Sequence, residues 1–142
     1  MVTCFLIPGK PQGNGRPRFN MDTKTVHTPE ATRRYEQTVR YSYLSAIPNG
    51  QRVHFGPCRV EIDAVFTAPK AWRVADQKAA LAGAITPENK PDCDNIAKAV
   101  LDALNGIAYK DDSQVADLVV RKRFGEEAHV SVRIESNGGE LR

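Results

Sequence analysis

The residues of this chain with the clearest chemical potential are acidic and lie in the segment from Lys90 to Asp117. Asp92 and Asp94 stand at the start of an expected helix, and a second acidic pair, Asp111 and Asp112, follows a glycine-containing turn. Carboxylates held close together repel one another unless one is protonated or a cation binds among them. Mg²⁺ prefers a few carboxylate oxygens together with water and substrate phosphate. The pattern therefore indicates phosphoryl transfer or phosphodiester chemistry.

The spacing of Asp92 and Asp94 has two interpretations. In a helix interior, residues two apart face opposite sides and could not share a ligand. Here Pro91 marks a helix start, where the backbone is not yet helical, so both side chains can turn toward one point. The alternative is that both aspartates only cap the helix, favoured by its dipole.

Lys98 lies four residues after Asp94 and therefore on the same face of the expected helix. It is either an exposed ion-pair partner of Asp94 or a cation that binds the scissile phosphate and steadies charge in the transition state. Asp112 follows the helix after one tight turn, which we expect to return it near the N-terminal end of that helix. The alternative for Asp112 is a solvated turn before a strand.

Other phosphate and metal sites are excluded by spacing. A calcium-binding loop that starts at Asp92 would need glycine at Ala97 and glutamate at Ala103. The chain has no nucleotide-binding loop of the G-x-x-x-x-G-K-[ST] type, and its three histidines show no ligand spacing. Its three cysteines form no C-x-x-C pair, which indicates reduced thiols in a cytoplasmic protein.

The charge of the chain is unevenly distributed. The net charge is +3, but the segment Glu88–Asp117 holds seven acidic and three basic residues, so the rest carries +7. A basic body around an acidic pocket is typical of a protein that binds a polyanion, although an ordinary mildly basic protein would also fit. The residues that we expect to contact nucleic acid are Lys10, Arg16, Arg18, Lys24, Arg33, Arg34 and Lys90.

The 142 residues suit one domain, with no apolar run long enough to span a membrane. Apolar periodicity predicts strands over residues 2–8, 58–67, 114–123 and 128–135, and helices over about 29–46, 74–81 and 94–104. Residues 9–28 are expected to form a loop, with room for a short hairpin, and residues 136–142 a frayed tail. The predicted fold class is α/β (α+β), a small mixed sheet packed with about three helices.

The segment "KPDCDNIAKAVLDALNGIAYKDDSQV" resembles the signature of the RusA family of Holliday junction resolvases. The opening "IPGKPQGNGRPR" and the segment "TPEATRRYE" resemble the first strand, basic loop and following helix of that family. The resemblance runs from about residue 3 to 134 and implies a single RusA-like domain over residues 1–142. It further implies a homodimeric endodeoxyribonuclease that depends on Mg²⁺, with Mn²⁺ as a substitute, and cuts four-way DNA junctions symmetrically.

Carried over residue by residue, the resemblance implies that Asp92, Asp94 and Asp112 bind the metal and that Lys98 is the catalytic lysine. Asp111 is a substitute for Asp112 or its supporting partner, because adjacent aspartates leave the match ambiguous by one position. The expected partners are branched DNA and a second copy of the chain, with no membrane and no small-molecule cofactor. Two alternatives stay open: a branched-DNA-binding protein with weak or no cleavage, and a structural protein whose acids only stabilise a turn around a metal.

Overall fold

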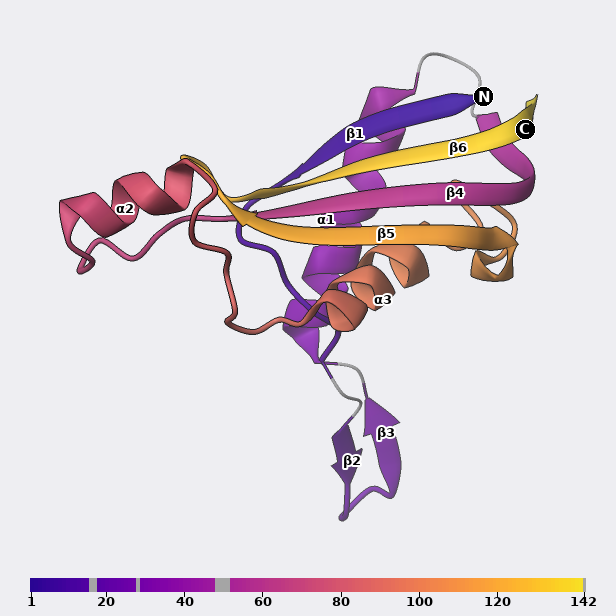
Figure 1. Cartoon of the computed structure of the whole chain (residues 1–142). Coiled ribbons are helices and arrows are strands. Elements are labelled where there is room, and N and C mark those ends of the chain that lie inside the picture. The colour runs from indigo at the N-terminus through magenta and orange to yellow at the C-terminus, as the bar shows by residue number, and fades with distance from the viewer. Residues whose placement is uncertain (16–17, 28, 48–51, 142) are drawn as a thin grey trace.

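The computed structural model describes residues 1–15, 18–27, 29–47 and 52–141. Its centre is a four-stranded sheet in the order β1-β6-β4-β5 (Figure 1). The strands are β1 (Val2–Pro8), β4 (Arg52–Phe66), β5 (Val115–Phe124) and β6 (His129–Leu141). β4 pairs parallel to β5 and antiparallel to β6, and β6 pairs antiparallel to β1, so the sheet is mixed as the sequence predicts.

Alternation of apolar and polar residues explains which side of the sheet forms the core. Along β4 the side chains of Val60, Ile62 and Ala64 are completely buried, while their neighbours Glu61 and Asp63 are half-buried on the other side. Successive side chains of a strand point to opposite faces, so this alternation buries one face and leaves the other to solvent. The predicted faces of the strands are therefore confirmed.

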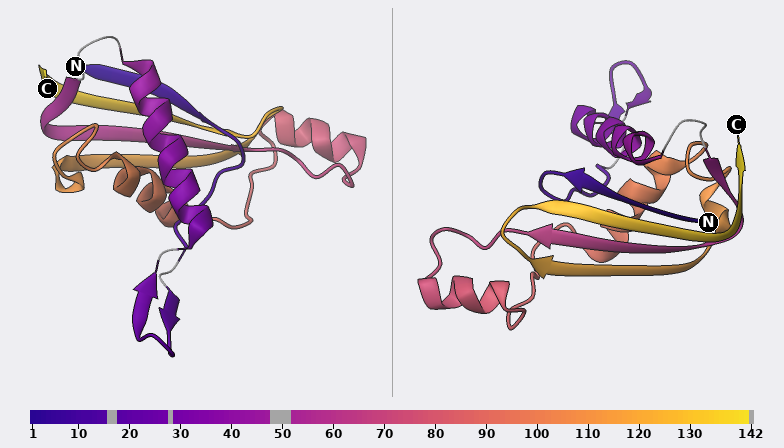
Figure 2. Two further views of the ribbon diagram at one scale, coloured as in Figure 1. Left: turned by 180° about the vertical axis from the view of Figure 1, so that it is seen from behind. Right: turned by 90° about the horizontal axis from the view of Figure 1, so that it is seen from above.

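Two helices cover the buried face of the sheet. α1 (Glu30–Ala46) and α3 (Cys93–Leu104) lie on the same side of it, and α2 (Val74–Leu81) lies beyond one end of the strands (Figure 2). The apolar stripe of α3 consists of Ile96, Ala97, Ala99, Val100, Ala103 and Leu104, all buried. The buried residues of α1 are Thr32, Tyr35, Val39 and Tyr43, whereas Ala31 is exposed.

The C-terminal end of α3 is held by side chains from two other segments. The guanidinium of Arg40 on α1 donates from Nε to the carbonyl of Ala103 at 3.0 Å. The hydroxyl of the buried Tyr109 donates to the carbonyl of Leu101 at 2.7 Å. Carbonyls of the last helical turn lack partners within the helix and carry negative partial charge, so a cation and a hydroxyl satisfy them and fix the helix end.

Two predicted strand boundaries, at the end of β6 and at the start of β4, are wrong. The predicted tail 136–142 belongs to β6, whose backbone pairs with β4 as far as Leu141 opposite Arg52. The first half of β4, from Arg52 to Gly56, was likewise expected to be loop. Backbone hydrogen bonds between strands do not require alternating apolar residues. The glycine-rich and polar end of β6 therefore pairs with β4 although its sequence does not alternate. Pro48, Asn49 and Gly50, the predicted end of the first helix, lie outside the described residues.

Short elements complete the chain. β2 (Arg18–Asn20) and β3 (Thr25–His27) form the hairpin anticipated in the basic loop, and η1 (Asp112–Gln114) is a single 3₁₀ turn before β5. None of the helices in the described ranges is long and apolar enough to cross a membrane.

A buried histidine joins the edge of the sheet to its centre. His54 on β4 is 1% exposed, with Nε2 2.9 Å from the hydroxyl of Thr3 and Nδ1 2.6 Å from that of Ser136. Burial, assisted by the positive amino terminus of Met1, lowers the pKa of His54 to about 4. The imidazole is therefore neutral in the folded protein at neutral pH.

We expect His54 to make folding stability depend on pH. In the unfolded chain His54 gains its proton near pH 6.5, but in the folded protein only near pH 4, so stability falls across this interval. The loss attributable to His54 is about 3 kcal/mol between pH 7 and 4. Urea unfolding of the wild type, His54→Gln and the control His129→Gln at several pH values measures it. The wild type and His129→Gln should lose this component and His54→Gln should not; parallel curves for all three would contradict the assignment.

Candidate metal and DNA-binding site

Asp92 and Asp94 lie together at the exposed N-terminal end of α3. Asp92 is the N-cap residue and Asp94 belongs to the first turn. Hydrogen bonding from its own backbone N–H is the main cause that lowers the pKa of Asp92; interaction with the neighbouring Asp94 side chain and the charges of Lys90 and Lys122 lower it further. The two acidic side chains are thus close enough to influence each other, and Asp92 is ionised at neutral pH.

Lys98 makes a different ion pair from the one expected. Its ammonium lies 3.4 Å from Asp102, one turn toward the C-terminus, and its side chain is 65% exposed. The predicted alternative of a pair with Asp94 is therefore not the one seen. An exposed pair of this kind is worth well under about 1 kcal/mol, so Lys98 can leave Asp102 for a phosphate at little cost.

Asp112 lies at the opposite end of α3 from the first acidic pair. Its backbone N–H donates to the side-chain oxygen of Asn105 at 2.8 Å, and Asn105 is the C-cap of α3. Twelve helical residues span about 18 Å. The expectation that the turn returns Asp112 to the start of the helix is therefore wrong for a single chain. Within the described residues, no three acidic, histidine or cysteine side chains gather closely enough to hold a metal.

The turn between α3 and β5 explains this separation. The amides of Ile107 and Ala108 bond back to the carbonyl of Leu104, and Tyr109 is completely buried beneath the helix end. Burial of a tyrosine ring removes a large apolar area from water and anchors the turn beside the last helical residues. The chain therefore enters η1 and β5 from the C-terminal side of α3.

Asp111 and Asp112 have separate roles in the structure. The Asp111 carboxylate caps η1 by accepting from the backbone of Ser113 at 3.0 Å, and hydrogen bonds from Ser113 lower its pKa. Gln114 completes the cap and also donates to the carbonyls of His54 and Gly56 on β4. The half-buried Asp112 carboxylate makes no hydrogen bond or ion pair with any part of the chain that the structure describes. It is the member of the pair that is available to a ligand.

The loop predicted after β1 packs on the exposed side of α3, a contact that the sequence did not predict. The backbone N–H of Asn14 donates to Asn95 at 3.2 Å, and its side-chain amide donates to Asp102 at 3.0 Å. A β-carbon on Gly13 would stand only 2.1 Å from the amide nitrogen of Asn95, so glycine is needed for this approach. The Gly-Asn-Gly triplet was the available signal, because glycines around one polar residue mark close backbone packing.

Four of the predicted basic residues belong to the β2–β3 hairpin and to α1, namely Arg18, Lys24, Arg33 and Arg34. The loop before the hairpin is fixed to α1 as well, since the amide of Gly15 donates to Thr32 at 2.8 Å. The hairpin projects from the body beside the N-terminal ends of α1 and α3 (Figure 1). It carries Arg18 and, in its turn, Lys24; Arg16 lies outside the described residues. On α1, Arg33 and Arg34 are exposed, and Arg34 pairs with Glu30 at 2.8 Å.

Two further predicted residues, Lys10 and Lys90, line one cleft next to the acidic pair. This Lys90 cleft, with a volume of about 250 Å³, is bounded by Lys10, Phe66, Thr67, Pro69, Pro87, Asn89, Lys90, Phe124 and Ala128. Lys122 on β5, which the sequence analysis missed, donates to the carbonyl of Asn89 and lies 5.3 Å from the centre of the Phe66 ring. Strand alternation could not identify Lys122 as a residue near the site, because its position on β5 faces the core side of the sheet.

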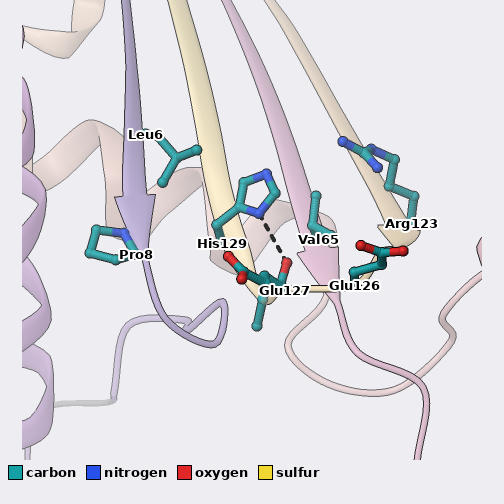
Figure 3. A pocket seen from close by; sticks show the side chains of 9 residues that line it. Leu6, Pro8, Val65, Arg123, Glu126, Glu127 and His129 are labelled. Carbon is teal, nitrogen blue, oxygen red and sulfur yellow. Dashed lines mark hydrogen bonds between the residues drawn. The ribbon is translucent and has the colours of Figure 1, made fainter.

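A second cavity lies elsewhere and contains none of the predicted site residues. It has a volume of about 420 Å³ and lies where β1, β4 and β6 meet the turn after β5 (Figure 3). His129 points into this region, and its Nδ1 lies 3.0 Å from the carbonyl of Glu127. The volume of this second cavity therefore does not identify it as the functional site.

Comparisons with known proteins identify the family of this chain. The family model described as Endodeoxyribonuclease RusA matches residues 8–135. The chain belongs to the RusA endodeoxyribonuclease family. A protein of Bacillus subtilis (strain 168) described as uncharacterized protein YqaN is 35% identical over 134 residues, which is 92% of this chain and 93% of that protein. The predicted family is thereby confirmed, and the RusA match covers both acidic pairs, Lys98 and the loop from Lys10 onward.

The contact between Gly13 and Asn95 gives a test of the packed loop. Gly13→Ala should lower the free energy of unfolding by about 1–3 kcal/mol, because the new methyl group overlaps Asn95. Asn95→Ala loses a hydrogen bond but removes the overlapping amide, so the double variant should lose less stability than the sum of the two single variants. A double-mutant cycle from urea unfolding measures this. Strictly additive losses would show that the loop does not pack here.

Proposed function

We propose that this RusA-family protein is a Mg²⁺-dependent endonuclease that resolves four-way DNA junctions by paired hydrolysis in a homodimer. The observation that carries the proposal is the exposed pair of Asp92 and Asp94 at the N-terminal end of α3, near the charges of Lys90 and Lys122. Two ionisable acids in the open beside cations are suited to a divalent ion and a phosphate together. The match to the endodeoxyribonuclease family supports the same conclusion.

The donor set fits a hard divalent ion. Asp92 is held ionised by hydrogen bonds and nearby lysines, and the exposure of both carboxylates leaves room for substrate oxygen. When bound, Mg²⁺ supplies Lewis-acid polarisation of the phosphate group. Lys98 supplies a mobile positive charge one turn along the same helix, where it stabilises charge that develops on the phosphate. Lys122 holds the neighbouring backbone by donating to the carbonyl of Asn89.

A second copy of the chain would complete the acidic site. Each chain offers Asp92 and Asp94 at one end of α3 and Asp112 at the other. Two such helices side by side and antiparallel would bring the first pair of one copy next to Asp112 of the other, twice, about a twofold axis. Each site would then hold three carboxylates, the number implied by the family resemblance.

The edge strand β5 is the surface on which we place the second copy. β5 is the outer strand of the sheet beside α3, whereas the other edge, β1, lies beside α1 (Figure 1). An edge strand of ten residues presents unpaired backbone groups, and its Leu118 is 42% exposed. Antiparallel pairing of two β5 strands would set the two α3 helices antiparallel and close together. A dimer with this twofold axis would match the symmetry of a four-way junction.

Loss of one carboxylate should separate cutting from binding. Asp92→Asn keeps the shape of the N-cap but removes a negative charge, so we expect cutting of a labelled four-way junction in Mg²⁺ to fall by at least about 100-fold. Junction affinity in a gel shift without metal should change little. Asp76→Asn on α2, which removes an exposed aspartate paired only with Arg73, is the matched control. Unimpaired cutting by Asp92→Asn would refute the assignment.

Mixed dimers test whether two copies share each site. A dimer of one Asp92→Asn chain and one Asp112→Asn chain, isolated through two different tags, keeps one fully wild-type site if the acids combine across copies. We expect this mixed dimer to nick one strand of the junction, while both parent variants stay inactive. The control is a mixed dimer of Asp92→Asn and Asp94→Asn chains, in which both sites remain damaged. An inactive Asp92/Asp112 mixture would contradict the shared site.

One observation favours an alternative function, the binding of branched DNA without efficient cleavage. Because a single chain does not gather three carboxylates within its described residues, it could bind branched DNA with weak or no cleavage. Incubation with a labelled junction over a range of Mg²⁺ and Mn²⁺ concentrations separates the two. Symmetric cuts near the crossover support the endonuclease, and a gel shift without cuts at any metal concentration supports the binding protein.

A further inference from the structure

We propose that the Lys90 cleft receives one unstacked nucleotide that flanks the cleaved phosphate, which would make the cleft a determinant of where the enzyme cuts. This inference rests on the proposed function, since it places DNA across the acidic pair. It concerns residues other than the four aspartates and Lys98, and it assigns the cleft a ligand of defined chemistry.

The position of the cleft is set by the chain leading into α3. Asn89 and Lys90 line the cleft, and Asp92 follows Lys90 after a single proline. Lys122 of β5 reaches the same segment, since it donates to the carbonyl of Asn89. A DNA strand with one phosphate at Asp92 and Asp94 therefore has its neighbouring nucleotide at the mouth of the cleft.

The lining of the cleft matches the parts of a nucleotide. Its walls include the rings of Pro69, Pro87 and the edges of Phe66 and Phe124, which are apolar and suit the faces of a base. Thr67 and the amide of Asn89 offer hydrogen bonds to base edges, and Lys10 and Lys90 are exposed cations that suit the backbone phosphate. Apolar contact with a base combined with cations for the backbone is how proteins hold single-stranded nucleotides. A lone phosphate would leave the apolar walls unused.

The walls of the cleft are held in place before any ligand arrives. Trp72 packs edge-on against Phe124 with ring centres 5.5 Å apart, and the Lys122 ammonium lies over the Phe66 ring. Phe66 and Phe124 are each 7% exposed, so the core fixes both rings. Ligand sites that are largely formed in advance bind at a lower cost in ordering.

A preformed nucleotide cleft would favour branched DNA over duplex DNA. To enter the cleft, a base must leave its stack, and this costs less where pairing and stacking are already interrupted. The bases at the crossover of a four-way junction meet this condition, and bases inside an arm do not. The cleft would therefore select a branch point through the ease of unstacking.

The test uses the full-length wild-type protein and synthetic junctions that carry 2-aminopurine, a base whose fluorescence rises when it unstacks. After the cut site is mapped, the analogue is placed on either side of the cleaved phosphate or, as a control, within an arm. Protein is added in EDTA so that no cutting occurs. We expect a several-fold rise in fluorescence at one flanking position and none in the arm.

Variants then tie the signal to the cleft. Thr67→Phe, a change at an exposed residue, should fill the cleft, abolish the fluorescence rise and lower cutting at least tenfold, with the Kd for the junction within threefold of wild type. Asn89→Leu is the second variant should Thr67→Phe fail to fold, as judged by thermal melting. Ala82→Phe adds the same ring at an exposed residue outside the cleft and should behave as wild type.

The outcomes separate this inference from the proposed function. A rise at a flanking position that is lost in the cleft variants supports the inference. If the protein binds and cuts junctions but no flanking position brightens, or if the rise survives in the cleft variants, the inference is overturned and the proposed function stands. If the protein neither binds nor cuts junctions, the proposed function fails, and this inference fails with it.

Discussion

The fixed length and orientation of α3 constrain everything else in this molecule. Burial of its alanine-rich stripe against the sheet, together with Arg40 and Tyr109 at its C-terminal end, holds the helix in place. A helix of twelve residues cannot bend its two ends together, so acidic residues beyond either end stay about 18 Å apart within one chain. Within one chain, Asp92 and Asp94 therefore stay apart from Asp112. The second copy that we propose is thus an answer to a constraint of packing rather than of the acids themselves.

The aspartates of this region differ in whether their side chains already have a partner within the fold. Asp111 is occupied as the cap of η1 and Asp102 by Asn14 and Lys98, whereas Asp112 has no partner among the described residues. Asp92 and Asp94 lie close to each other, an arrangement that is unfavourable for two ionised groups unless cations are near. Asp111 and Asp102 are thus used to hold the structure, and Asp92, Asp94 and Asp112 are the aspartates available to a ligand. This division identifies candidate site residues more sharply than their number in the sequence does.

Local rules predicted much of the fold and the placement of Asp92 and Asp94 at a helix start. Alternation along residues 58–67 gave the buried face of β4, and Pro91 before Asp92 gave a helix start that carries both aspartates. The position of Asp112 depended on how Tyr109 packs under the helix end, which no local spacing encodes. Lys10 and Lys90 come from distant segments and meet at one cleft only in the folded chain, where Lys122 of β5 also reaches the carbonyl of Asn89. The position of Asp112 and the residues that meet at the cleft therefore depend on long-range packing, which local sequence patterns do not encode.

The central claim, that one ion is held by acids from two copies, is tested most directly by locating the metal. Crystals of the dimer soaked in Mn²⁺ and measured at the manganese absorption edge would show each ion as an anomalous peak. We expect two peaks related by a twofold axis, each beside Asp92 and Asp94 of one copy and Asp112 of the other. A peak coordinated by the acids of a single copy, or a dimer whose α3 helices lie far apart, would contradict this account.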